Sequence, residues 1–231
     1  MSIIGIIGAM KVETEYLHSI MKNIKETEIA HLVFYEGIIG ETNVVLVQSG
    51  VGKVNAAMVA TILITLFKVS HIINTGIAGG ISKELSIFDM VISTDAIHHD
   101  MDAIAFGYKA CEVPGLNTVA FPADKRMIKL AKEAFAEGKF VKKIIEGRVA
   151  SGDQFIATAE AKAKIVKACN PVCCEMEGAA VAQVAYLNNV PFIIVRTISD
   201  MAENTNEVYE EKEAAKYSSF LVEHLVRKLA K

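Results

Sequence analysis

The hydrophobic residues of this chain gather in short apolar runs that alternate with amphipathic stretches. The runs at 3–8, 71–76 and 191–199 are almost wholly apolar, which is typical of strands buried on both faces. Other β-rich runs lie at 31–39, 43–50, 89–97 and 143–151. Helical patterns lie at 12–21, 53–67, 124–136, 159–168, 177–188 and 207–230. This alternation predicts an α/β fold, a three-layer sandwich with a mixed central β-sheet.

Two features refine this architecture. The runs 31–39 and 43–48 are separated only by "GET" and predict a hairpin, so the sheet is not purely parallel. The segment 99–123 fits neither pattern, and a loop of this length is usually functional or an interaction segment. Because no repeat, low-complexity tract or linker interrupts the chain, we expect residues 1–231 to form a single domain.

Composition excludes several classes of protein. The formal net charge is -3 and there is no basic cluster, which argues against nucleic acid as a partner. The opening "SIIGIIGAM" lacks a basic n-region and a cleavage site, and it is interpreted as a strand. The longest apolar run, Val54 to Phe67, is about 14 residues and too short to cross a membrane. The four cysteines lack zinc spacing and are expected to be reduced and buried, as in a cytoplasmic protein.

Polar residues and glycines stand where the predicted strands end. Ligands of open α/β folds bind beyond the carboxyl ends of strands, so these positions are candidates for a site. They are Glu13, the segments "NTGIAGG", "SGDQF" and "EMEG", and Arg196 and Asp200 within "RTISD". Each also has an ordinary structural explanation, such as a helix cap for Glu13 or Asp200 and a turn for the glycines. Their concurrence favours a ligand site.

Seven ordered segments resemble a known family. They are "GIIGAM…E", "SGVGKVNAA", "NTGIAGG", "HHDMDAIAFGY", "SGDQF", "EMEGAAVA" and "RTISD". Together they look like the 5′-methylthioadenosine/S-adenosylhomocysteine nucleosidases of the nucleoside phosphorylase superfamily. The resemblance implies hydrolysis of the N9–ribose bond of these substrates, and also of 5′-deoxyadenosine, in methionine salvage and S-adenosylmethionine recycling. It implies no metal or organic cofactor.

The resemblance also assigns roles to residues. Glu13 aligns with the general base for water and Asp200 with the acid that protonates adenine N7. Glu177 and the Met176 backbone align with the groups that hold the ribose hydroxyls. The remaining substrate-binding positions are Phe155 stacking on adenine, Ile156 at its Watson–Crick edge, Gly79 in the glycine segment, Arg196 near the water, and Met10 and Val51 beside the sugar. In a homodimer, the partner subunit lends Ala103, Phe106 and Pro114 to the 5′-substituent pocket.

The chemistry of glycoside hydrolysis agrees with these roles. Carboxylates near the ribose stabilise oxocarbenium character, and adenine leaves readily only when a ring nitrogen is protonated. A phosphorylase would need several cationic groups for phosphate, but of four arginines only Arg196 falls in the predicted site. Lys11, at a helix start, is expected to be solvated. Hydrolysis is therefore favoured over phosphorolysis.

Some alternatives stay open. They are a purine nucleoside phosphorylase-type enzyme, a nucleosidase that prefers 6-amino-6-deoxyfutalosine, and a nucleoside-binding protein without activity. Two departures from the family pattern bear on substrate preference. Ile77 stands where many members have serine, and the segment 203–211 does not align with the usual lid, although Tyr209 is a candidate aromatic cap. Glu175 is interpreted as structural.

Overall fold

Strands and helices alternate along the chain as the sequence pattern predicts. The structure is a computed structural model that describes residues 2–116, 118–138, 140, 142–203 and 209–229. Its strands are β1 (Ile3–Gly8), β2 (Lys22–Ile29), β3 (Leu32–Ile39), β4 (Thr42–Gln48), β5 (His71–Gly80), β6 (Met90–His98), β7 (Phe121–Pro122), β8 (Ile144–Ser151), β9 (Cys173–Glu175) and β10 (Phe192–Asp200). Its helices are α1 (Lys11–Ile20), α2 (Lys53–Thr65), α3 (Lys125–Glu137), α4 (Ala159–Cys169), α5 (Gly178–Leu187) and α6 (Glu211–Leu229), with a 3₁₀ turn η1 (Ile104–Phe106).

All of these strands join one mixed sheet, in the order β10-β6-β8-β9-β5-β1-β4-β3-β2, with β7 pairing with β6. β10 also pairs with β5, so β5, β9, β8, β6 and β10 close into a ring from which β1, β4, β3 and β2 extend. β1 runs parallel to both β4 and β5, whereas β3 is antiparallel to β4, as the predicted hairpin requires. The sheet is therefore mixed, as expected.

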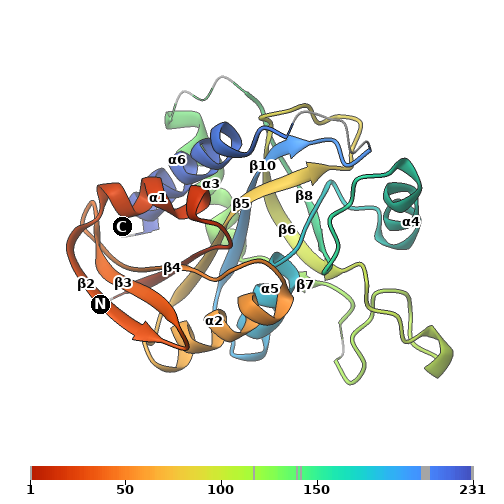
Figure 1. The fold of residues 1–231 in the computed structure, drawn as a ribbon, viewed down its shortest axis with the longest axis horizontal. Coiled ribbons are helices and arrows are strands. Elements are labelled where there is room, and N and C mark those ends of the chain that lie inside the picture. Colours follow the sequence, from red (N-terminus) through yellow and green to blue (C-terminus); the bar gives the residue numbers. More distant parts are fainter. Residues whose placement is uncertain (1, 117, 139, 141, 204–208, 230–231) are drawn as a thin grey trace.

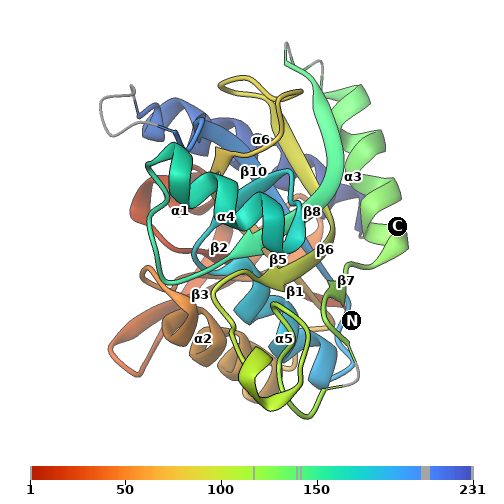
Figure 2. The same cartoon turned by 90° about the vertical axis from the view of Figure 1, so that its right-hand side faces the viewer.

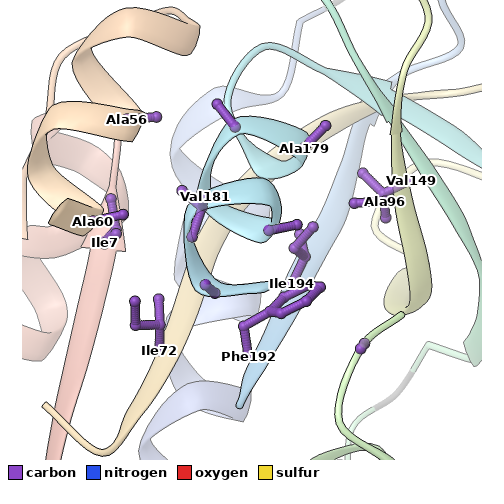
Figure 3. Close-up of a cluster of buried hydrophobic side chains, with 14 of the residues drawn as sticks. Ile7, Ala56, Ala60, Ile72, Ala96, Val149, Ala179, Val181, Phe192 and Ile194 are labelled. Atoms are coloured by element: carbon purple, nitrogen blue, oxygen red, sulfur yellow. The ribbon is translucent and has the colours of Figure 1, made fainter. Parts of the chain in front are cut away.

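Helices cover both faces of the sheet and complete three layers (Figure 1). On one face α1, α3 and α6 bury a core that includes Leu17, Met127 and Leu221. On the other face α2 and α5 lie together, with Ala60 beside Ile7 of β1 and Ala179 pointing toward Ala96 of β6 and Val149 of β8 (Figure 3). Each larger aliphatic side chain buried in these two layers contributes about 1.5–3 kcal/mol. The two cores fix the sheet between them.

The end of the sheet far from β2 carries the irregular parts of the fold. There α4 lies beside the ring, and the long segment between β6 and β7 projects from the same end (Figures 1 and 2). That segment contains η1 but no strand or longer helix among its described residues, which confirms that 99–120 is mostly irregular. Among the described residues, no helix is long and apolar enough to cross a membrane.

The structure also contains strands that the sequence pattern did not predict. β2 has the sequence "KNIKETEI" and most of its residues are exposed, so it lacks an apolar run. β7 spans two residues and is too short to give a pattern. β9 ends at Glu175, where the segment "EMEG" was expected to follow a strand. β5 continues to Gly80, so the prediction that this strand stops at residue 76, within "NTGIAGG", was wrong. These glycines are part of a central strand instead of a turn beyond it.

Candidate active site

A cavity of about 260 Å³ opens where β1, β8, β9 and β10 end around the middle of β5. Four carboxyl groups reach its wall: Glu13, Glu175, Glu177 and Asp200. The rest of the described lining consists of apolar side chains, small residues, Ser199 and Tyr209, with no lysine, arginine or histidine. The cavity is thus both partly apolar and rich in carboxylates, which is the combination expected of a small-molecule site.

Glu13 is held by three backbone N–H groups. Its position on the first turn of α1 lets Oε2 accept from the N–H groups of Ala9, at 2.7 Å, and Met10, at 2.9 Å. Oε1 accepts from the N–H of Ile77 on β5 at 3.1 Å. Burial raises the pKa of Glu13, and the charge of Arg196 and these hydrogen bonds offset the rise only in part. The carboxyl group is therefore both the helix cap that its position suggests and a fixed group of increased basicity at the cavity wall.

The absence of a side chain at Gly76 lets Glu13 approach β5. A Cβ atom at Gly76 would lie 2.2 Å from Glu13 Oε1 and 3.1 Å from Arg196 Nη1. Glu13 and Arg196 thus both lie against the space where a side chain at Gly76 would be. This explains a glycine within an otherwise buried strand.

Arg196 lies behind the wall and is not among the residues that line the cavity. Its Nη2 donates to Asn74 Oδ1 at 2.6 Å and to a carboxylate oxygen of Glu175, with which it forms a buried ion pair. The resemblance implies that Arg196 helps to order the water and Glu13, and this role stays a prediction. The guanidinium acts on Glu13 through its charge, at short range, while its hydrogen bonds go to Asn74 and Glu175.

Glu175 and Glu177 differ because the chain changes from strand to helix between them. β9 ends at Glu175 and α5 begins at Gly178. Glu175 accepts hydrogen bonds from the N–H groups of Glu177 and Gly178 and from the hydroxyl of Ser151. Burial alone would raise the pKa of Glu175, but Arg196 and these donors outweigh it and lower the pKa. Glu175 is thus an ionised cap of α5.

Glu177 has much weaker support for a negative charge. Its Oε1 accepts a single hydrogen bond, from the N–H of Gly52 at 2.8 Å, at the start of α2. Burial and the neighbouring charge of Glu175 raise the pKa of Glu177 to about 8. Near neutral pH the empty cavity therefore contains a protonated Glu177, which can donate one hydrogen bond and accept others.

Asp200 is the last residue of β10 and is 7% exposed. Its Oδ1 accepts from the N–H of Ala202 at 2.9 Å, and its Oδ2 lies 2.9 Å from the hydroxyl of Ser199. A Cβ atom on Gly79 would lie 3.1 Å from Asp200 Oδ1 and 3.0 Å from the Cβ of Ala202. Gly79 therefore leaves room for this turn, which matches its predicted place at the site.

Aromatic and apolar side chains close the mouth of the cavity. Phe155, which is 65% exposed, follows β8 and meets Tyr209 edge to face with ring centroids 6.1 Å apart. Met10, Met176 and Val51 complete the apolar wall. Ile156 does not line this cavity but an adjoining hollow of about 30 Å³, which shares Phe155 and Asp200 with it. Residues 204–208 of the predicted lid lie outside the described residues.

The predicted partner-subunit residues do not reach the cavity of their own chain. Ala103, Phe106 and Pro114 lie on the segment between β6 and β7, and none lines the cavity. Phe106 is 85% exposed at the end of η1. Lys11 is exposed, as expected. The backbone N–H of Ile77 donates to Glu13, while the Ile77 side chain packs with Ala214 and Ala215 of α6.

Some residues of the site were not singled out from the sequence. Asn74 and Ser151 begin the segments "NTGIAGG" and "SGDQF", and both bind the Arg196–Glu175 pair. Ser199 and Gly52 contact Asp200 and Glu177. All four stand within the segments that carried the resemblance. No property of their residue type distinguished them before their partners were known.

Comparisons with known proteins agree with this geometry. The sequence model of the phosphorylase superfamily matches residues 3–228. A 5′-methylthioadenosine/S-adenosylhomocysteine nucleosidase of Staphylococcus aureus (strain bovine RF122 / ET3-1) is 43% identical over 230 residues, which cover 98% of this chain and 100% of that protein.

Solved structures with a similar fold include proteins named for two different substrates. The Neisseria meningitidis 5′-methylthioadenosine/S-adenosylhomocysteine nucleosidase in complex with methylthio-immucillin-A has a TM-score of 0.93 and 36% identity, covering 99% of this chain and 100% of its own. The native futalosine hydrolase of Helicobacter pylori strain 26695 has a TM-score of 0.90 and 29% identity, covering 98% of each chain. The fold alone therefore does not choose among these substrates.

Proposed function

The chain belongs to the phosphorylase superfamily, and from that premise we propose that it hydrolyses the N9–ribose bond of 5′-methylthioadenosine and S-adenosylhomocysteine. The observation that carries the proposal is the set of carboxyl groups around one partly apolar cavity, Glu13, Glu177 and Asp200. The 43% identity to a protein named for this activity supports it over the whole chain.

Each of these three carboxyl groups suits one task. Glu13 has a raised pKa and fixed oxygens, and it takes the proton of the attacking water. Asp200, oriented by Ala202 and Ser199, gives a proton to N7 of adenine so that the base leaves as a neutral molecule. Glu177 binds the ribose hydroxyls, and the positive charge that develops on the sugar favours ionisation of Glu177, whose negative charge then stabilises the oxocarbenium character. Phe155 offers a face on which adenine stacks.

The charge of the cavity supports hydrolysis over phosphorolysis. A phosphate nucleophile needs cationic donors, yet the described lining contains four carboxyl groups and no cationic side chain. Arg196 is already bound to Glu175 and Asn74. Phosphate would therefore be repelled, whereas a neutral water molecule is not.

The 5′-substituent distinguishes the candidate substrates. The 5′ end of the sugar lies nearest the apolar side chains Met10 and Val51, which suits a methylthio group or the hydrogen of 5′-deoxyadenosine. A second candidate is 6-amino-6-deoxyfutalosine, because a futalosine hydrolase shares the fold at 29% identity. In a homodimer Ala103, Phe106 and Pro114 of the partner would complete this pocket, and the exposure of Phe106 supports such an interface.

Adenine release tests the proposal. The purified protein should release adenine from 5′-methylthioadenosine at a rate that does not depend on phosphate, with free 5-methylthioribose as the second product. A rate that requires phosphate and yields the sugar 1-phosphate would identify a phosphorylase instead. Parallel assays with S-adenosylhomocysteine, 5′-deoxyadenosine and 6-amino-6-deoxyfutalosine would rank the substrates by kcat/KM. A protein that binds these nucleosides and cleaves none of them would be a binding protein.

A further inference from the structure

Lys162 lies on α4, outside the cavity, but is directed at the turn that follows Asp200. Its side chain is 11% exposed. Its Nζ donates to the carbonyl oxygen of Met201 at 2.8 Å and to Glu203 Oε1 at 2.7 Å. A lysine so deeply placed gives up much of its side-chain freedom, which is an entropic cost to folding. The contact with Met201 therefore invites a functional explanation.

The carbonyl that Lys162 binds belongs to the same peptide group as the N–H that holds Asp200. The Met201 carbonyl and the Ala202 N–H are the two ends of one planar unit. The Ala202 N–H donates to Asp200 Oδ1 at 2.9 Å. A cation at the carbonyl end fixes the plane of this peptide and polarises it, so that its N–H becomes a stronger donor.

The turn needs such support. Ala202 has φ +55°, a left-handed conformation that is unfavourable for a non-glycine residue. The residue is 1% exposed and packs directly above Gly79, where a Cβ would lie 3.0 Å from its own. A flip of the Met201–Ala202 peptide would turn the N–H away from Asp200. The hydrogen bond from Lys162 opposes that flip.

We propose that Lys162 is a positioning residue for the general acid, acting on Asp200 through the Met201–Ala202 peptide. The Ala202 N–H can only donate, so Oδ1 stays an acceptor, whereas the Ser199 hydroxyl, which donates to Oδ2 of the ionised group, can turn toward the Ala78 carbonyl oxygen at 3.4 Å and accept from a protonated Oδ2. Lys162 thereby selects which oxygen of Asp200 carries the proton and where it points. This inference rests on the proposed function, because it assigns Asp200 the role of acid.

The ion pair with Glu203 does not explain the position of Lys162. The Glu203 side chain is 58% exposed, so water screens this pair and it contributes little to stability. The two contacts can be separated by mutation. Glu203→Gln removes the ion pair and keeps the Lys162–Met201 hydrogen bond, whereas Lys162→Met removes both with little change in side-chain length.

The experiment measures kcat and KM for 5′-methylthioadenosine in five proteins. They are the wild type, Lys162→Met, Lys162→Arg, Glu203→Gln and the control Lys164→Met. Lys164 lies on the same helix and pairs only at the surface with Glu160, where the two side chains are 75% and 81% exposed. Thermal unfolding of each variant shows whether α4 stays in place, and Lys162→Gln replaces Lys162→Met if the latter does not fold.

We expect Lys162→Met to lower kcat about 10-fold with KM within about 2-fold, because only proton transfer to the leaving group is affected. Lys162→Arg should recover most of kcat, since a guanidinium also reaches the carbonyl. Glu203→Gln and Lys164→Met should match the wild type. An unchanged kcat in Lys162→Met, or an equal loss in Glu203→Gln, overturns this inference and leaves the proposed function standing. A wild type that releases no adenine overturns both.

Discussion

Glu177→Gln should make the protein more stable at alkaline pH while abolishing most of its activity. In the wild type the Gly52 N–H donates to Glu177 Oε1 at 2.8 Å. The amide of glutamine has the same size and keeps an oxygen that can accept this hydrogen bond. It removes only the ability to ionise. Stability and function are therefore expected to respond in opposite directions to this one substitution.

The magnitude follows from the raised pKa. Burial and the charge of Glu175 raise the pKa of Glu177 from 4.5 to about 8. Because the folded state holds the proton more tightly than the unfolded state, stability is fully present below pH 4.5 and is lost as pH rises to about 8. At 1.36 kcal/mol per unit the loss has an upper limit of about 5 kcal/mol. Water that enters the open cavity reduces this, and we expect about 2 kcal/mol.

Equilibrium urea unfolding at a series of pH values from 5 to 9 measures the effect. At pH 5, just above the unfolded-state pKa of 4.5, much of the stability from the protonated carboxyl is still present, so the free energies of unfolding of the two proteins should differ by less than about 1 kcal/mol. At pH 9 Glu177→Gln should be more stable by about 2 kcal/mol, or about 4–8 °C in thermal midpoint for a chain of this length. Glu160→Gln is the matched control, because this substitution makes the same chemical change at a side chain that is 81% exposed.

Parallel curves would refute this reasoning. If the wild type and Glu177→Gln lose stability equally between pH 5 and pH 9, then Glu177 is already ionised in the folded protein at pH 5. A gain of equal size in Glu160→Gln would point to the net charge of the molecule instead of the buried carboxyl group.

Three further substitutions test the other groups of the site. Asp200→Asn should lower kcat about 10²–10⁴-fold and still bind adenine in an equilibrium titration; near-normal turnover would exclude Asp200 as the acid. Glu13→Gln should fold and bind substrate but lose a similar factor in kcat, since an amide takes no proton from water, and retained hydrolysis would exclude Glu13 as the base. Gly76→Ala should lower kcat at least 10-fold, because its Cβ would fall 2.2 Å from Glu13 Oε1 and push that carboxyl aside; an unchanged kcat would show that Glu13 can move freely.

The hydrophobic pattern predicted the buried elements of the fold and missed the exposed or very short ones. The strands β1 and β10 and the helices on both faces are apolar enough to give a clear period. β2 is stabilised by pairing with β3 and not by burial, so its charged sequence carries no such signal. The ring closure through β10 and β5 depends on pairing between segments more than a hundred residues apart, which no local pattern contains.

The candidate site was predictable as a set of residues but not as a set of contacts. Glu13, Glu177 and Asp200 all reach one cavity, as the resemblance implied. Arg196 is buried, and its partner is Glu175. Positions two residues apart in an extended chain point to the same side, so only the switch from β9 to α5 separates the tasks of Glu175 and Glu177.

The site buries several carboxyl groups beside one cation, and this burial lowers the stability of the folded protein. Arg196 forms an ion pair with Glu175, and backbone N–H groups support the other two glutamates, three for Glu13 but one for Glu177. Glu177 is thus the group with the least compensation, and its pKa is the one raised to about 8. A positively charged sugar in the cavity would supply the missing compensation. The same arrangement that destabilises the empty protein at alkaline pH therefore favours the transition state over the ground state, which is the requirement for catalysis.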